Sequence, residues 1–227
     1  MESNYSFDLV MMRYGISNQI TRKPDIHFVH QLRKLFENEN TFNAALFNSF
    51  PLSVIIDYVE NTHKYYLNKK LKEIEQSIDI LLQDYSDNHP LLCILHEFYS
   101  DYTMELSEHI LEEENTLLPY ISYLISCEEN DFSTPEFYMQ SRNFSLCSFI
   151  ESHHDTEDDL QKVRFAILSY NPPATNETPY RVLLSQLQVF EKDLSIHALI
   201  EDQVLIPRAL KLERKWTDTF RGIWKMN

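Results

Sequence analysis

The residues best suited to chemistry lie in an eleven-residue segment that occurs twice in the chain. Residues 109–119 read HILEEENTLLP and residues 197–207 read HALIEDQVLIP. Each copy carries a histidine and, four residues later, a glutamate: His109 with Glu113, and His197 with Glu201. Residues four apart lie on one face of a helix, one turn from each other, so each imidazole and carboxylate can bind one metal ion or two adjacent ions. The repeated pair predicts a metal site.

Two lone histidines extend this repeat. His63 precedes His109 and His154 precedes His197 by similar stretches of chain. At about 1.5 Å per residue, a helix leaving His63 and a second returning to His109 would span roughly 31 and 27 Å, and the two arms between His154 and His197 about 25 Å each. Two antiparallel hairpins would therefore bring four imidazoles and two carboxylates together. Di-iron and di-manganese centres are built from such inward-facing side chains on four helices.

This set of ligands suits iron, manganese or zinc. Glu113 and Glu201 are the expected bridges between two metal ions, with room left for exchangeable ligands such as O₂ or NO. Glu105 lies one turn before His109 and is a candidate for a supporting hydrogen bond, a proton relay or an auxiliary iron site, with a solvated carboxylate as the alternative. Asp193 stands in the same relation to His197. An isolated H-x-x-x-E pair is usually an accident of the surface, but two copies within a longer repeat argue against that interpretation.

The low glycine content excludes several other kinds of site. The chain has 2 glycines in 227 residues, where average usage would give roughly 16. It contains neither G-x-G-x-x-G nor G-x-x-x-x-G-K-[ST], so nucleotide chemistry lacks its usual sequence support. Sheets with many tight hairpins also rely on glycine in their turns. The composition therefore predicts an all-α fold.

Charge and cysteine content limit the partners and the compartment. The net charge of −15 opposes binding to nucleic acids and to anionic membranes. We find no signal sequence and no apolar run long enough to span a bilayer. The 3 cysteines form no C-x-x-C pair, and they fit a reducing compartment. We therefore expect a cytoplasmic protein with no nucleic-acid or membrane partner.

Prolines separate the predicted helices, because proline is tolerated at helix starts and disfavoured inside them. After an N-terminal segment with helical spacing at residues 25–48, long helices are expected at residues 52–84, 91–126, 135–170 and 179–216. Pro119 is expected to bend or end the second of these, and Pro207 to bend the fourth. Short connections predict an antiparallel up-down four-helix bundle over residues 51–227, with residues 1–50 as an N-terminal helical extension.

These features resemble the bacterial hemerythrin-like proteins of the repair-of-iron-centres group, also called regulators of cell morphogenesis and nitric oxide signalling. The resemblance covers about residues 54–210. It is most specific at residues 62–64, 105–119, 151–155, 172–173 and 190–210. It implies a hemerythrin-like bundle with a non-haem centre of two iron ions, oxo- and carboxylate-bridged, rather than manganese or zinc. The implied ligands are His63, His109, Glu113, His154, His197 and Glu201.

Two positions near the implied ligands are also interpreted from the resemblance. The His-Asp step at residues 154–155 selects His154 over its neighbour His153 as the third histidine. His153 stands where the family usually has a glutamate, which changes the surroundings of that ligand. Glu105 matches a family glutamate implicated near the iron. Family members often begin with a small domain carrying a cysteine pair, whereas residues 1–50 of this chain contain no cysteine.

The family's function defines the expectation for this chain. The resemblance implies repair of iron–sulfur clusters damaged by nitric oxide or peroxide, by donation of iron to the damaged proteins. The alternative is a hemerythrin-like module that binds or senses O₂ or NO without transferring iron. Redox catalysis at the iron ions, such as reduction of NO, is a further alternative, and a structural bundle without metal remains the plainest one.

Overall fold

The computed structural model describes residues 10–14, 25–85, 90–129, 144–152, 165 and 178–226. Within these residues the chain forms helices and no strand, which confirms the predicted all-α fold. The α-helices are α2 (Ile26–Glu37), α3 (Ala44–Phe47), α4 (Leu52–Tyr65), α5 (Leu71–Tyr85), α6 (Pro90–Glu112), α7 (Leu118–Glu129), α9 (Leu146–Ser152), α11 (Thr178–Ile200) and α12 (Ile206–Met226). The structure also has three π-helical segments, η2 (Tyr66–Lys70), η3 (Glu113–Leu117) and η4 (Glu201–Leu205), and a 3₁₀ turn, η1 (Glu39–Thr41). Residues 10–14 are helical as well.

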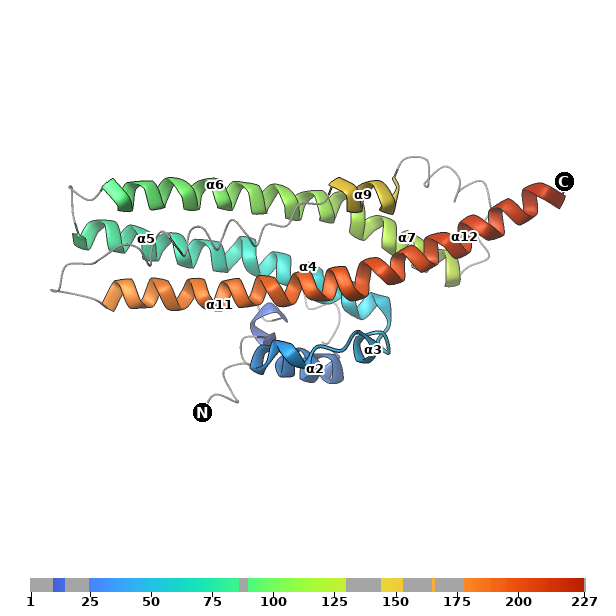
Figure 1. Ribbon diagram of the computed structural model, residues 1–227, viewed down its shortest axis with the longest axis horizontal. Coiled ribbons are helices and arrows are strands. Elements are labelled where there is room, and N and C mark those ends of the chain that lie inside the picture. The colour runs from blue at the N-terminus through green and yellow to red at the C-terminus, as the bar shows by residue number, and fades with distance from the viewer. Residues whose placement is uncertain are drawn as a thin grey trace.

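The π segments join the long helices into three rods that lie side by side (Figure 1). The first rod is α4–η2–α5, the second is α6–η3–α7, and the third is α11–η4–α12. The second and third rods run in the direction opposite to the first. α5 contacts both α6 and α11, and α12 contacts α7. Of the predicted helix 135–170, the structure describes residues 144–152 and 165. Residues 144 and 145 are not helical and α9 begins at Leu146, so the prediction of one helix running through this stretch is wrong at these two positions; the rest lies outside the described residues.

The core consists of two hydrophobic clusters, one toward each end of the rods. The first cluster lies where α5 ends and α6 begins, and we call it the hairpin-end cluster. It joins η2, α5, α6 and α11 through residues such as Ile74, Leu106 and Leu187. The N-terminal cluster joins α2, α3, α4, α7 and α12. Along each rod, membership changes from one cluster to the other near a predicted metal ligand. The polar centre of the bundle therefore lies between two apolar clusters.

The N-terminal helices pack against one side of the rods (Figure 1). Asp25 caps α2, because its carboxylate accepts hydrogen bonds from the backbone N–H groups of His27 and Phe28 at 2.9 and 3.1 Å. The apolar face of α2 then buries Phe28, Val29, Leu32, Leu35 and Phe36. Phe28 forms edge-on ring contacts with Phe47, Phe50 and Tyr58. The segment before Pro51 thus shares a core with the bundle.

Both predicted proline sites lie directly after a π segment, and the rods turn there without ending (Figure 1). The Leu118 N–H donates to the Glu113 carbonyl, and the Ile206 N–H donates to the Glu201 carbonyl, each across five residues. Pro119 and Pro207 follow at the second position of the next α-helix. A missing N–H and the proline ring are tolerated in a first helical turn. The π segments therefore let each helix continue past its proline.

The packing of α2 predicts the effect of deleting one aromatic side chain. Phe28 is fully buried, so Phe28→Ala should lower the free energy of unfolding by about 3–5 kcal/mol, as measured by urea denaturation. Leu46→Ala in α3 is the control, because the Leu46 side chain is 47% exposed and its removal should cost much less. Equal effects of the two substitutions would show that the N-terminal helices do not share the core.

Candidate metal centre

The three π segments lie next to predicted metal ligands. Glu113 is the first residue of η3, Glu201 is the first residue of η4, and η2 begins three residues after His63. A π segment inside an α-helix is rare and occurs often at functional sites. Each segment inserts a wider turn where the rod reaches the centre of the bundle. All three rods therefore have the same local irregularity at the level of the predicted ligands, which is typical of a functional site.

Three of the predicted ligands converge at that level, one from each rod. The ligand atoms of His63, Glu113 and His197 all lie within 4.8 Å of one another. The Nε2 atoms of His63 and His197 are 3.2 Å apart, and their ring centroids are 5.0 Å apart. His63 Nε2 also lies 3.2 Å from Glu113 Oε2. The structure thus brings together side chains that are far apart in the sequence.

The Glu113 carboxylate reaches two histidines with its two oxygens. Oε2 faces His63 of the first rod, whereas Oε1 lies 3.1 Å from Nε2 of His109, one turn earlier on its own rod. The His109 side chain is 19% exposed, while that of His63 is fully buried. This arrangement separates an inner histidine position from an outer one, with Glu113 between them.

Glu201 and His197 complete the described part of the cluster. Glu201 Oε2 lies 3.4 Å from His197 Nε2, and both side chains are buried. Burial raises the pKa of Glu201 well above its ordinary value, and the nearby Glu113 carboxylate raises it further. Burial and the neighbouring His63 lower the pKa of His197. Both groups are therefore pushed toward their neutral forms.

His63 is shifted in the opposite direction. Burial lowers its pKa, but hydrogen bonds to the Glu113 and Glu114 carboxylates outweigh burial and raise the pKa to about 9. The single positive charge of a protonated His63 thus faces two carboxylates, Glu113 through Nε2 and Glu114 through Nδ1, and the imidazole of His197. Such a group of buried acids and bases is poorly compensated without a cation.

The donor atoms fit a bound metal ion. Two ligands about 2.1 Å from one metal, at an angle near 100°, lie about 3 Å from each other, close to the spacing of the His63 and His197 nitrogens. Among the described residues, the buried atoms Glu201 Oε1 and His197 Nδ1 have no hydrogen-bond partner. Mixed imidazole and carboxylate donors suit iron. Burial, spacing and donor chemistry therefore all accommodate a metal.

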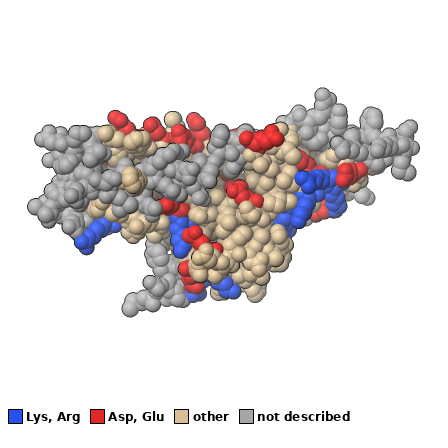
Figure 2. All heavy atoms as spheres, viewed as in Figure 1, with Lys and Arg blue, Asp and Glu red and all other residues tan. Residues whose placement is uncertain are grey.

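The remaining predicted site residues are placed differently. His154 and its neighbour His153 lie outside the described residues. Glu105 is exposed and belongs to a row of exposed acidic side chains along α6, namely Glu97, Asp101, Glu105, Glu108 and Glu112. Figure 2 shows acidic side chains along the edge where α6 runs. The proposed supporting role of Glu105 and His153 stays a prediction.

One charged residue near the cluster was not predicted from the sequence. Arg13 is 1% exposed and pairs with Asp193, which lies one turn before His197 in α11. The Tyr66 ring is also close, with its centroid 5.8 Å from that of His197. The available signal for Arg13 was a single cation within the otherwise uncharged stretch Val10–Tyr14, which gives no indication of its partner.

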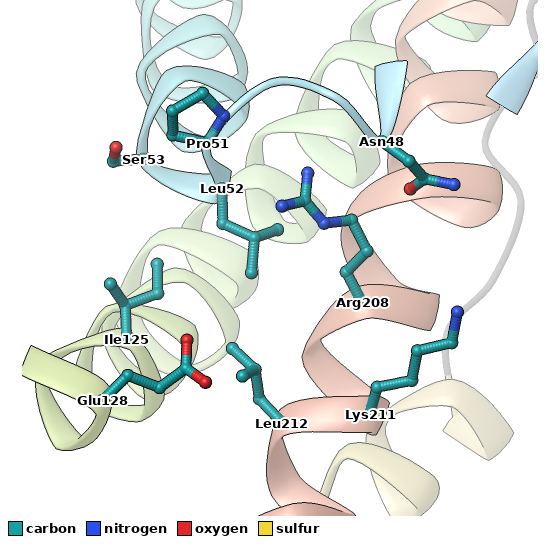
Figure 3. Close-up of a pocket in the computed structure, with 9 residues that line it drawn as sticks. All are labelled: Asn48, Pro51, Leu52, Ser53, Ile125, Glu128, Arg208, Lys211 and Leu212. Atoms are coloured by element: carbon teal, nitrogen blue, oxygen red, sulfur yellow. The ribbon is translucent and has the colours of Figure 1, made fainter. Parts of the chain in front are cut away.

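A surface pocket of about 520 Å³ lies away from these ligands. Figure 3 shows Arg208 and Leu212 of α12 pointing toward Leu52 at the start of α4, with Ile125 and Glu128 contributed by α7; Lys211 of α12 also lines the pocket. One Arg208 nitrogen donates to the Phe50 carbonyl at 2.6 Å. The pocket lining includes none of the predicted metal ligands, so it is separate from the candidate centre.

The protein is thus an all-α bundle with a buried cluster of histidines and glutamates at its centre. In the part of the chain that the structure describes, no helix combines the length and the apolar character that a membrane span requires.

No family model matches the chain, but individual proteins are similar to it in sequence. The chain is 22% identical to the iron-sulfur cluster repair protein ScdA of Staphylococcus epidermidis over 196 residues, which cover 86% of this chain and 84% of that protein. It is 25% identical to the iron-sulfur cluster repair protein YtfE of Escherichia coli over 163 residues, covering 71% and 68% of the two chains. These homologues confirm the resemblance found from the sequence motifs.

The buried Glu201 carboxyl predicts how the stability of the metal-free protein depends on pH. A glutamate with a raised pKa keeps its proton in the folded state after the unfolded chain has lost it, so stability falls as pH rises above the ordinary glutamate range. His63 acts in the same direction: its stabilisation is complete below about pH 6.5 and is lost as pH rises through its folded pKa of about 9. Glu201→Gln removes the first contribution and weakens the second, because the Glu201 carboxylate is one of the charges that raise the pKa of His63.

Urea denaturation in the presence of a chelator at pH 7.5 and pH 9 measures this effect. Glu201→Gln should stabilise the metal-free protein at pH 9, by roughly 1–3 kcal/mol, and should weaken its pH dependence. Glu60→Gln in α4 is the matched control, because the Glu60 side chain is 43% exposed. A Glu201→Gln variant with the pH dependence of the wild type would contradict a raised pKa of the Glu201 carboxyl in the folded protein.

Proposed function

We propose that this protein is a non-haem di-iron protein that repairs iron–sulfur clusters damaged by nitrosative or oxidative stress, by donating iron to the damaged proteins. The observation that carries the proposal is the convergence of His63, Glu113 and His197 from three rods, with donor atoms within 4.8 Å. The repair role in the proposal is supported by relatives that are named iron-sulfur cluster repair proteins. The proposed clients are cytoplasmic proteins with damaged clusters.

The geometry suggests how the proposed ligands divide between two iron ions. His63 and His197, whose Nε2 atoms are 3.2 Å apart, would hold the inner iron. His109 would hold the outer iron, and His154, which lies outside the described residues, is the remaining proposed ligand for it. Glu113 and Glu201 would bridge the two. The two oxygens of Glu113 support a bridging role, because they face His63 and His109 separately. When bound, the pair of irons supplies transferable metal and a place where small oxygen or nitrogen ligands bind.

The protein side chains have distinct tasks in this proposal. The Glu113 and Glu201 carboxylates would offset the charge of the irons, and Glu201, which is pushed toward its neutral form in the metal-free state, would release its proton when a cation binds. The apolar clusters on either side exclude water and strengthen these charge interactions. His109 is partly exposed, whereas His63 is buried, so the iron held by His109 is the one we expect to exchange with the surroundings.

A binding or sensing role for O₂ or NO is the alternative use of the same centre. It needs the same ligands but no loss of iron. A reversible change in absorption upon addition of O₂ or NO, with the iron content unchanged and no recovery of damaged clusters, would assign this role in place of iron donation.

The ligand set predicts different effects of replacing two adjacent histidines. The wild type should bind about two irons per chain, and His154→Gln should bind about one, because the outer iron loses a ligand. His153→Gln is the matched control and should retain about two. Iron content by elemental analysis and the absorption of the bridged pair measure the outcome. Loss of iron in the His153 variant alone would assign the ligand to the other histidine.

Iron donation predicts recovery of a damaged [4Fe–4S] enzyme. Incubation with the iron-loaded protein and a thiol reductant should restore the activity of a peroxide-treated hydratase, because the reductant supplies the electron and the donor the Fe²⁺ that convert the oxidised three-iron cluster back to the four-iron form. The donor should lose iron in proportion to the clusters repaired. The double variant Glu113→Gln/Glu201→Gln, which lacks both proposed bridges, should restore none. An equal concentration of free Fe²⁺ with a chelator present excludes adventitious iron. An iron-loaded wild type that restores no activity would overturn the donor role but not the metal centre.

A further inference from the structure

A buried arginine connects the N-terminal segment to two of the helices that carry proposed ligands. Arg13 lies in the helical residues 10–14 and is 1% exposed. Its Nη2 atom pairs with Asp193 Oδ1 of α11, and its Nε atom donates to Thr62 Oγ1 of α4 at 3.0 Å. One planar guanidinium therefore joins two different rods. Arginine suits this task because its donors are held in a fixed, flat arrangement.

Both partners of Arg13 lie close to proposed ligands in the chain. Thr62 directly precedes His63, and Asp193 lies one helical turn before His197. These are the two histidines whose Nε2 atoms lie 3.2 Å apart. Because Arg13 binds one residue beside each, it fixes the relative position of α4 and α11 where the inner pair of ligands forms.

The surroundings of Arg13 hold its guanidinium in place. The rings of Phe36, Tyr65 and Tyr58 lie 5.2, 5.5 and 5.7 Å from the guanidinium carbon. Cations are attracted to aromatic faces at such distances, and more strongly when water is excluded. Phe36 belongs to α2, and the two tyrosines belong to α4. The guanidinium thus lies between α2 and the first rod.

Arg13 also compensates a third buried carboxylate near the centre. Asp193 is 1% exposed; burial raises its pKa, and the charge of Arg13 opposes that shift. Glu113 and Glu201 already place two carboxyl groups among the proposed ligands. By binding Asp193, Arg13 supplies the largest of several compensating interactions for a carboxylate one turn from His197; Tyr66 and Lys70 contribute the others. Glu113 and Glu201 are then left to balance the metal charge.

We propose that Arg13 is a positioning residue of the metal centre, which acts through Thr62 and Asp193 to hold His63 and His197 together. The N-terminal segment is then part of the site. This inference rests on the proposed metal centre, and it adds a residue outside the six proposed ligands.

Metal titration of the full-length protein tests the inference. Co²⁺ serves as the probe, because its visible absorption reports ligand number and geometry. Arg13→Met keeps the length of the side chain and removes its charge and donors. We expect it to weaken Co²⁺ binding about 10- to 100-fold, the usual effect of losing a group that orients a ligand, and to change the spectrum at saturation. Arg13→Lys restores the charge and should recover part of the affinity.

Two controls separate positioning from general stability. Arg33→Met removes an arginine of α2 that pairs with Glu37 on the surface, and it should leave both affinity and spectrum unchanged. Leu32→Ala truncates a fully buried residue of α2 and should destabilise the fold without touching Thr62 or Asp193. Its saturated Co²⁺ spectrum should match that of the wild type. A spectral change in Arg13→Met but not in Leu32→Ala supports positioning.

The possible outcomes distinguish the two proposals. A folded Arg13→Met protein with wild-type affinity and spectrum overturns the role of Arg13 and leaves the metal centre intact. If that variant does not fold, Thr62→Val decides, because it removes the acceptor and keeps the side-chain shape: a weaker affinity supports the inference and an unchanged affinity overturns it. A wild type that binds neither iron nor Co²⁺ overturns the metal centre and the role of Arg13 together.

Discussion

The burial of Glu113 and Glu201 among histidines explains how the surrounding helices are arranged at the centre of the bundle. Carboxylates are costly to bury unless paired charges or hydrogen bonds compensate them. Here the same space holds two carboxyl groups and the imidazoles of His63 and His197, and His63 is held protonated by its acidic neighbours. Such a cluster is a poor choice for stability alone. It becomes reasonable when a cation is the intended partner, because one ion can satisfy several of these groups at once.

The fold places this cluster where a cation would be held firmly. Apolar clusters lie on either side of it along the rods, so the donors are shielded and their positions are set by packing. The π segments then adjust the rods where the donors face inward. In a regular α-helix, an inward-facing glutamate takes a position that the apolar stripe would otherwise occupy. The wider turn accommodates both, and it also lets Pro119 and Pro207 follow without ending the helix.

The sequence predicted the parts of this arrangement that depend on helical periodicity. Low glycine content indicated an all-α protein, and the H-x-x-x-E spacing together with the matched helix lengths placed His63, His109 and His197 at one level. The π segments were not predicted, because i→i+5 hydrogen bonding leaves no periodic signal in a short stretch. The sequence feature that accompanies η3 and η4 is a proline six residues after each glutamate. Glu105 is a residue for which spacing leaves two interpretations open, a supporting role and a solvated carboxylate. It lies one turn from His109, yet its side chain is exposed on the acidic face of α6.

Arg13 shows what spacing cannot predict at all. Its contacts with Thr62 and Asp193 join residues separated by 49 and 180 positions, and they arise only because α2 packs across the rods and brings the N-terminal segment with it. The resembled family often carries a cysteine pair in its N-terminal domain, whereas the segment before Pro51 here contributes a guanidinium. A cysteine pair would offer redox chemistry or metal ligands of its own. A guanidinium supplies a fixed positive charge and a rigid set of donors, so in the proposed arrangement the N-terminal segment supports a centre whose six proposed ligands all come from residues after Pro51.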